Sequence, residues 1–226
     1  MGIRSAQPRT AERCRVLIVD DHPIVRRGLG QLIDRESDME LIGEADSPSS
    51  ALDAVEALSP HVVVADLSFE GLDGIELIKD LRARHPGLPV LVLSMHDESF
   101  YAQRVLKAGA MGYLMKQEGV EQVVDGIRSV REGRVFLSNR MSQALLSRMT
   151  GGSNRPPTYG VESLTDRELE VLRLIGQGRS TRQIAEQLHL SIKTIETHRE
   201  NIKQKLRLEN ASQLMQYAVR FAIEPT

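Results

Sequence analysis

The first half of the chain alternates short apolar runs rich in β-branched residues with amphipathic helical patterns, and this alternation limits the possible folds more than any other feature of the sequence. Runs of this kind joined by helices indicate βαβ units, because neighbouring parallel strands need a crossover connection. We therefore expect an α/β domain with a doubly wound (βα)5 parallel sheet. Its expected strands are 15–19, 41–45, 62–65, 90–94 and 112–115.

The segments between these runs carry apolar residues at helical spacing. Ser47 and Pro48 predict the start of the second helix, because serine caps helix N-termini and proline is tolerated in the first turn. The most regular helical period follows the last expected strand, at Val120, Val123, Val124, Ile127 and Val130.

Polar side chains stand where the expected strands end. Asp20 and Asp21 follow the first strand, Asp66 follows the third, Ser94 ends the fourth and Lys116 follows the fifth. In a doubly wound sheet these positions share one edge, which is where ligands bind. Three carboxylates repel one another unless cations compensate them, and one divalent cation with Lys116 would balance their charge. Mg²⁺ is the expected cofactor, since it binds few carboxylates and leaves positions for phosphate oxygens.

This set of groups suits the transfer of a phosphoryl group onto a carboxylate. Asp66 is the expected nucleophile because it stands alone at its strand end, whereas Asp20 and Asp21 form a pair suited to hold the metal. Lys116 and the metal would neutralise charge on the phosphoryl oxygens, and Ser94 would donate a hydrogen bond to one of them.

A purely structural role for these residues is also open. Asp21 could cap a helix that begins near Pro23. His22 and His96 border the site without a third ligand at metal spacing, so we expect them to be loop residues. By its sequence position alone, Tyr113 is expected to be a half-buried aromatic residue of the last strand.

Residues 15–132 resemble a response-regulator receiver domain on these same positions. The resemblance implies that Asp20 and Asp21 are the acidic pair and Asp66 the phospho-acceptor. It further implies that the backbone carbonyl of Ser68 is a metal ligand, and it assigns supporting roles to Ser94, to Lys116 and to Tyr113 as an aromatic switch.

The loop after Asp66 departs from the family pattern, because Phe69 and Glu70 stand where Met-Pro is usual. Without the proline the loop loses one φ restraint, and Glu70 adds a negative charge near the site. The rate or lifetime of phosphorylation is therefore expected to differ from the usual one.

A stretch rich in Gly, Ser and Pro at 151–160 is the clearest linker, and a helix is expected before it at 138–149. The expected division is an N-terminal tail at 1–14, the α/β domain at 15–132, a linker at 133–161 and an all-α domain at 162–226. Capping signals at Thr165, Ser180 and Asn210 support four helices in the last domain, at 166–176, 181–188, 192–207 and 211–222.

The third of these helices is amphipathic and locally basic. Ile195, Ile202 and Leu206 form its apolar stripe, and residues 191–207 hold five Lys or Arg against two Glu. A short connection joins it to the preceding helix, as in a helix-turn-helix unit that places its second helix in the major groove. A solvated amphipathic helix is the alternative.

Residues 164–206 closely resemble the LuxR-type helix-turn-helix, and the order of the segments is that of NarL/FixJ-type response regulators. The resemblance implies recognition positions at Glu196, Thr197 and Glu200. It places Lys193, Thr194, Arg199 and Lys203 nearer the DNA backbone or flanking bases, and Arg207 belongs to the same polar face. It also implies a dimer contact on the last helix, which must in part close the small core.

The expected function is a DNA-binding transcription regulator, not an enzyme, controlled by phosphoryl transfer from a sensor histidine kinase to Asp66 and forming a homodimer when active. A regulator that never takes phosphate is the main alternative. A phosphatase with an aspartate nucleophile is a second alternative. Such enzymes carry an Asp-x-Asp motif after the first strand, however, and here the two acids are adjacent.

The N-terminus lacks the apolar core of a signal peptide, and no apolar run approaches the length of a membrane span. Cys14 is the single cysteine, so no intramolecular disulfide is possible. We expect a cytoplasmic protein that does not bind membranes.

Overall fold

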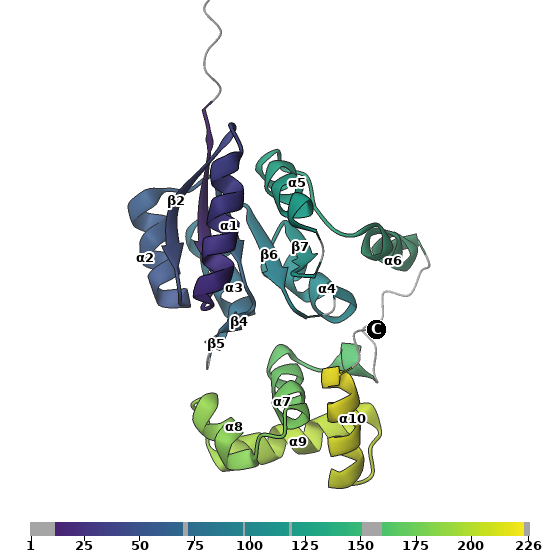
Figure 1. Ribbon diagram of the computed structural model, residues 1–226. Helices are drawn as coiled ribbons and strands as arrows, with labels where there is room; N and C mark the ends of the chain where they lie inside the picture. Colours follow the sequence, from purple (N-terminus) through teal and green to yellow (C-terminus); the bar gives the residue numbers. More distant parts are fainter. Residues whose placement is uncertain (1–11, 70–71, 97, 118, 151–159, 224–226) are drawn as a thin grey trace, which may run out of the picture.

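The computed structural model describes residues 12–69, 72–96, 98–117, 119–150 and 160–223, and it places an α/β unit above a smaller helical unit in the view of Figure 1. The elements of the α/β unit are, in order, β1 (Cys14–Val19), α1 (Pro23–Arg35), β2 (Met39–Ala45), α2 (Pro48–Leu58), β3 (Val62–Ala65), β4 (Ser68–Phe69), β5 (Leu72–Asp73), α3 (Gly74–Arg84), β6 (Val90–Ser94), α4 (Glu98–Ala108), β7 (Gly112–Met115) and α5 (Val120–Arg131).

The expected parallel sheet is confirmed, with the strand order β2-β1-β3-β6-β7. The chain reverses its direction of winding between β1 and β3, which is the point where doubly wound sheets place their ligands. Val19 pairs with Ala65, so β1 and β3 end level with each other. Because helices cover both faces, the strands are buried on both sides, and separate apolar clusters form on the two faces.

A small antiparallel hairpin of β4 and β5 follows Asp66 and was not expected from the sequence. Strands of two residues are too short to show an alternating pattern, which explains the omission. Phe69, one of the residues that depart from the family pattern, has only 6% of its surface exposed and joins the apolar core. Glu70 lies outside the described residues.

The start of α1 excludes the capping alternative for Asp21. The N-cap residue is His22, Pro23 opens the helix, and no side-chain hydrogen bond caps this helix within the described residues. The expected cap of α2 is confirmed, since the Ser47 side chain accepts a hydrogen bond from the backbone N–H of Ser50.

The helical part comprises α6 (Asn139–Thr150), the 3₁₀ turn η1 (Val161–Ser163), α7 (Asp166–Gly176), α8 (Thr181–Gln187), α9 (Ile192–Leu206) and α10 (Ala211–Ile223). Capping boxes at Thr165 and Ser180 are confirmed, and Asn210 caps α10 through the N–H of Gln213. Helix α9 ends one residue before the expected end, because Arg207 takes up a left-handed conformation with a φ of 55°.

Helix α6 lies beside α4 rather than with the other C-terminal helices (Figure 1). Its Met141 is buried, and the Ser138 hydroxyl donates a hydrogen bond to the buried carboxylate of Glu98 at the start of α4. None of the helices in the described part of the chain is long and apolar enough to span a membrane.

Candidate functional site

The sheet brings the polar strand-end residues to one edge. The backbone N–H of Asp66 donates to the carbonyl of Val19 at 2.8 Å, which continues the β1–β3 pairing past the last strand residue. The N–H of Lys116 donates to the carbonyl of Ser94 at 2.8 Å in the same way. Asp20, Asp66 and Lys116 therefore follow β1, β3 and β7 at the same rim, as the sequence predicted.

Lys116 bridges two buried carboxylates. Its Nζ lies 2.6 Å from Oδ2 of Asp20 and 2.9 Å from Oδ2 of Asp66. The lysine side chain has 10% of its surface exposed and each aspartate side chain 3%. The second oxygen of Asp66, Oδ1, accepts a hydrogen bond of 2.7 Å from the N–H of Leu67. These contacts fix both carboxylates in place.

Burial and charge act on this cluster in opposite directions. Burial raises the pKa of Asp66, and the opposing charge of Lys116 only partly offsets that rise. Burial alone would lower the pKa of Lys116, but the two carboxylates around its ammonium raise it overall. The lysine is therefore charged at neutral pH, and it does not fully compensate the acids around it.

The same acids form a group that could hold a cation. Asp20, Asp21, His22 and Asp66 offer ligand atoms that all lie within 4.8 Å of one another. Three carboxylates and one lysine leave two negative charges, and carboxylate oxygens are the ligands of hard divalent cations. The residues therefore fit Mg²⁺ by charge and donor type.

His22 was left out of the expected site, yet its ring lies against both acids. Its Nδ1 is 2.6 Å from Oδ1 of Asp21 and 3.2 Å from Oδ1 of Asp20. The side chain is 63% exposed and Asp21 is 29% exposed, so this side of the cluster is open to solvent. The adjacency of His22 to the Asp pair was the only sequence signal that could have included it.

Ser94 and Tyr113 lie on the other side of the cluster and are both linked to His96. Ser94 is fully buried, and its Oγ accepts a hydrogen bond of 3.2 Å from the N–H of His96. The hydroxyl of Tyr113 donates to the carbonyl of His96 at 2.6 Å. Tyr113 is 1% exposed, so the expectation of a half-buried ring was wrong, because α4 covers this face of β7.

The ring of His96 is held tightly in this arrangement. It stacks on Tyr101 with ring centroids 4.6 Å apart, and its Nε2 lies 2.9 Å from Oγ of Ser68. Burial, together with the nearby charges of Arg173 and Lys116, lowers its pKa to about 4, so the ring is neutral at physiological pH.

The role of the Ser68 carbonyl as a metal ligand stays a prediction.

Helix α9 turns its polar face outward, as its pattern predicted. Ile195 and Ile202 are fully buried against the neighbouring helices. Of the eight expected DNA-contacting residues, five are exposed and three are half-buried. The exposed ones are Lys193, Glu196, Thr197, Glu200 and Arg207, and the half-buried ones are Thr194, Arg199 and Lys203.

Two internal contacts order this face. The ammonium of Lys203 lies 2.7 Å from the carboxylate of Glu200, one helical turn earlier. The hydroxyl of Thr197 donates to the carbonyl of Lys193 at 3.0 Å. The pair with Lys203 offsets the charge of Glu200, one of the two acidic residues at the expected recognition positions.

Two family models match the chain. The model described as response regulator receiver domain covers residues 16–128, and the model described as bacterial regulatory proteins, luxR family, covers residues 162–218. The chain is 39% identical over 209 residues to the transcriptional regulatory protein LiaR of Bacillus subtilis (strain 168), with 91% of this chain and 97% of LiaR covered. It is 34% identical to the nitrate/nitrite response regulator protein homolog of Haemophilus influenzae, with 88% and 93% covered.

A solved structure of similar architecture is RcsB from Salmonella enterica serovar Typhimurium, bound to promoter P1flhDC in the presence of phosphomimetic BeF3⁻. The TM-score is 0.68 at 29% identity, and the match covers 92% of this chain and 98% of the other.

Proposed function

Because the chain belongs to the response regulators that join a receiver domain to a LuxR-type DNA-binding domain, we propose that phosphorylation of Asp66 controls its binding to DNA. The observation that carries this proposal is the position of Lys116, which bridges Asp66 and Asp20 at the open edge of the sheet. A sensor histidine kinase is the partner that supplies the phosphoryl group, and double-stranded DNA is the ligand of the second domain.

The geometry supports a direct transfer. A carboxylate oxygen of Asp66 attacks the phosphorus, the bond from phosphorus to the kinase histidine breaks, and the histidine leaves with the electron pair. Mg²⁺ held by Asp20, Asp21, Asp66 and the carbonyl of Ser68 would neutralise charge on the phosphoryl oxygens. Lys116 supplies a second positive charge from the protein itself, already aimed at Asp66.

The contacts of Ser94 connect this chemistry to the rest of the receiver. The Ser94 hydroxyl can donate its proton to an oxygen of the new phosphoryl group, which moves its Oγ away from the N–H of His96. His96 also accepts the hydrogen bond from Tyr113, so a shift of Ser94 changes the anchor of that ring. These linked hydrogen bonds lie just before α4, so the charge change at Asp66 would alter the position of this helix.

The outward face of α9 supports binding in the major groove. Lys193, Arg199 and Arg207 would contact phosphates, while Glu196, Thr197 and Glu200 lie where they can face base edges. Matching solved structures include two RcsB dimers bound to two parallel DNAs. We propose that this chain also binds as a homodimer once it is phosphorylated.

The test uses the full chain, Mg²⁺ and acetyl phosphate, with intact mass as the readout. The wild type is expected to gain one phosphoryl group and to bind tighter to DNA selected from a random library. Asp66→Asn should gain none, and chelation of Mg²⁺ should stop the reaction in the wild type. Equal DNA binding by Asp66→Asn and the treated wild type would instead support a regulator that needs no phosphate. Steady hydrolysis of a phosphate ester that depends on Asp20 would indicate a phosphatase.

A further inference from the structure

A cavity of about 660 Å³ lies between the two domains and includes the proposed phospho-acceptor. The receiver contributes Asp66, His96 and Lys116 to its lining. The DNA-binding domain contributes Arg173 from α7, Gln177 directly after α7, and Phe221 and Ala222 from α10. The second domain therefore forms one wall of the cavity in which phosphorylation would occur.

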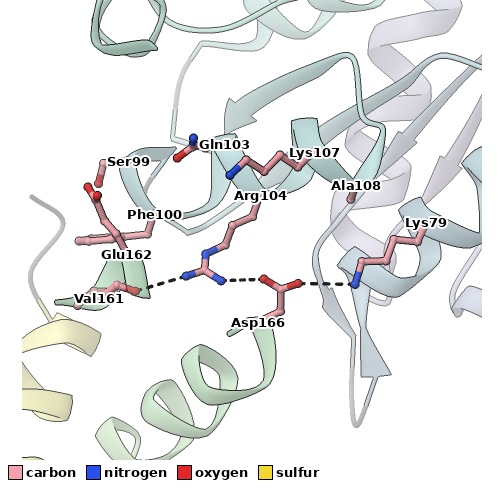
Figure 2. A pocket seen from close by; sticks show the side chains of 10 residues that line it. All are labelled: Lys79, Ser99, Phe100, Gln103, Arg104, Lys107, Ala108, Val161, Glu162 and Asp166. Atoms are coloured by element: carbon pink, nitrogen blue, oxygen red, sulfur yellow. Dashed lines mark hydrogen bonds and ion pairs between the residues drawn. The ribbon is translucent and has the colours of Figure 1, made fainter. Parts of the chain in front are cut away.

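An ionic contact fixes α7 in this position (Figure 2). The guanidinium of Arg104 in α4 donates to the carboxylate of Asp166, at the start of α7, at 2.8 Å, and to the carbonyl of Leu164 at 2.7 Å. Lys79 of α3 lies 3.6 Å from the other oxygen of Asp166. Two basic residues of the receiver thus converge on one carboxylate of the DNA-binding domain.

An aromatic contact fixes α10 in the same way. The rings of Phe100 and Phe221 meet edge to face, with centroids 5.2 Å apart and planes inclined at 63°. Both phenylalanines also line the cavity. Arg104 and Phe100 both belong to α4, so this one helix of the receiver contacts both α7 and α10, the helices that line the cavity from the other domain.

Arg173 is the charged residue that the DNA-binding domain contributes to the cavity lining. It is half-buried, and across the residues that the structure describes no carboxylate pairs with its guanidinium. Its charge lies close enough to His96 to help lower the pKa of that ring. A partly buried guanidinium without a counter-charge favours binding of an anion, and planar guanidinium groups suit phosphate oxygens.

We propose that Arg173 binds the phosphate group of a small phosphodonor, such as an acyl phosphate dianion, as it approaches Asp66 through this cavity. In the reaction the Asp66 oxygen bonds to phosphorus, the bond from phosphorus to the acyl oxygen breaks, and the carboxylate leaves with the electron pair. This inference rests on the proposed function, and it makes the DNA-binding domain part of the donor site of the receiver.

If Arg173 only binds the donor, its removal should change the donor concentration at which phosphorylation is half-maximal and leave the rate of phosphoryl transfer at saturation unchanged. The full chain, as wild type, Arg173→Ala or Arg173→Lys, is incubated with Mg²⁺ and a series of acetyl phosphate concentrations, and the phosphorylated fraction is followed by intact mass. We expect Arg173→Ala to raise the half-saturating concentration about three- to tenfold, with an unchanged saturating rate. Arg173→Lys should restore only part of the loss, because it keeps the charge but not the planar guanidinium, and added salt should shrink the difference.

A matched control removes an arginine of the same domain outside the cavity. Arg179 is exposed and does not line the cavity, so Arg179→Ala should behave as the wild type. Arg104→Ala tests the dependence on domain contact, because the weaker docking in that background should reduce the effect of Arg173→Ala.

The outcomes separate this inference from the proposed function. If the wild type accepts no phosphoryl group, the proposed function fails. If the wild type is phosphorylated at Asp66 but Arg173→Ala matches it at every donor concentration, only the role of Arg173 fails. An effect of Arg173→Ala that is equally large with Arg104→Ala would also overturn the cross-domain site.

Discussion

The guanidinium of Arg104 lies 2.8 Å from the carboxylate of Asp166, although 62 residues separate them and each belongs to a different domain. The arginine side chain is 15% exposed and the aspartate 29%, so the pair is partly protected from solvent. The same arginine also donates hydrogen bonds to the carbonyl oxygens of Val161 and Leu164, just before α7. Arg104 therefore makes three polar contacts to the other domain.

Arg104→Ala should loosen the contact between the domains. The loss of one partly exposed ion pair and its neighbouring hydrogen bonds is worth about 1 kcal/mol, which shifts the docking equilibrium about fivefold. Small-angle scattering of the full chain should show a larger radius of gyration. Arg84→Ala on α3 is the control, because Arg84 is 53% exposed and its ion pair, with Glu56 at 3.9 Å, lies within the receiver. Identical scattering curves for Arg104→Ala and the wild type would contradict a docked arrangement held by this contact.

Lys116→Ala should destabilise the receiver by about 3 kcal/mol, because it leaves two buried carboxylates without their shared cation. Urea denaturation at neutral pH without Mg²⁺ measures this change. The double variant Lys116→Ala with Asp66→Asn should recover part of the loss, since it also removes one of the two charges. No recovery would mean that the lysine acts through packing alone.

The raised pKa of Asp66 predicts a specific pH dependence of stability. A carboxyl whose pKa is higher in the folded chain favours folding while it is protonated. That contribution is complete below its ordinary pKa of 3.8 and is lost as the pH rises through the raised value. Without Mg²⁺, the free energy of unfolding of the wild type should therefore fall relative to that of Asp66→Asn over this range. A constant difference between the two chains across the range would refute the raised pKa.

Mg²⁺ should stabilise the wild type, because the proposed site exists in the folded chain and not in the unfolded one. The melting temperature should rise by about 2 to 5 °C at saturating Mg²⁺ and not at matched ionic strength of Na⁺. Asp21→Asn should remove most of this shift. Asp34→Asn is the control, because Asp34 is an exposed residue of α1. A shift of the same size in Asp21→Asn would place the cation elsewhere.

Two variants of α9 separate contacts to the DNA backbone from contacts to bases. Lys193→Ala should weaken binding to all sequences and reduce the slope of log affinity against log salt by about one. Glu196→Ala should change sequence preference more than overall affinity, and should not lower the salt slope. Binding measured at several salt concentrations on selected and random DNA distinguishes the two. A lower salt slope for Glu196→Ala would be incompatible with its placement over base edges.

The sheet and its polar edge could be predicted because their signals are local and regular. β-branched runs mark the strands, and strand ends place Asp20, Asp66 and Lys116 at one rim whatever the details of packing. The caps at Thr165 and Ser180 are equally local, because each needs only a side chain three residues away.

Features that depend on distant contacts could not be predicted in this way. The inward position of Tyr113 depends on the carbonyl of His96 and on α4. The place of Arg173 in the cavity wall depends on how the receiver and the DNA-binding domain meet, and the sequence of either unit carries no period or spacing that predicts it. The roles of the site residues stay predictions that the variants above can test, and the domain limits stay predictions as well.

The buried ring of Phe69 has a consequence for how the loop beyond Asp66 responds to heat. A proline keeps its restraint at every temperature, since the restraint lies in covalent bonds. In this chain Glu70 occupies the position of that proline, so the described part of the loop is restrained by the contacts of Phe69 with the surrounding core, whose strength varies with temperature and is lost when that core loosens. Warming should therefore free this loop before the sheet melts, and a thermal sensitivity of phosphate lifetime would originate at this hairpin.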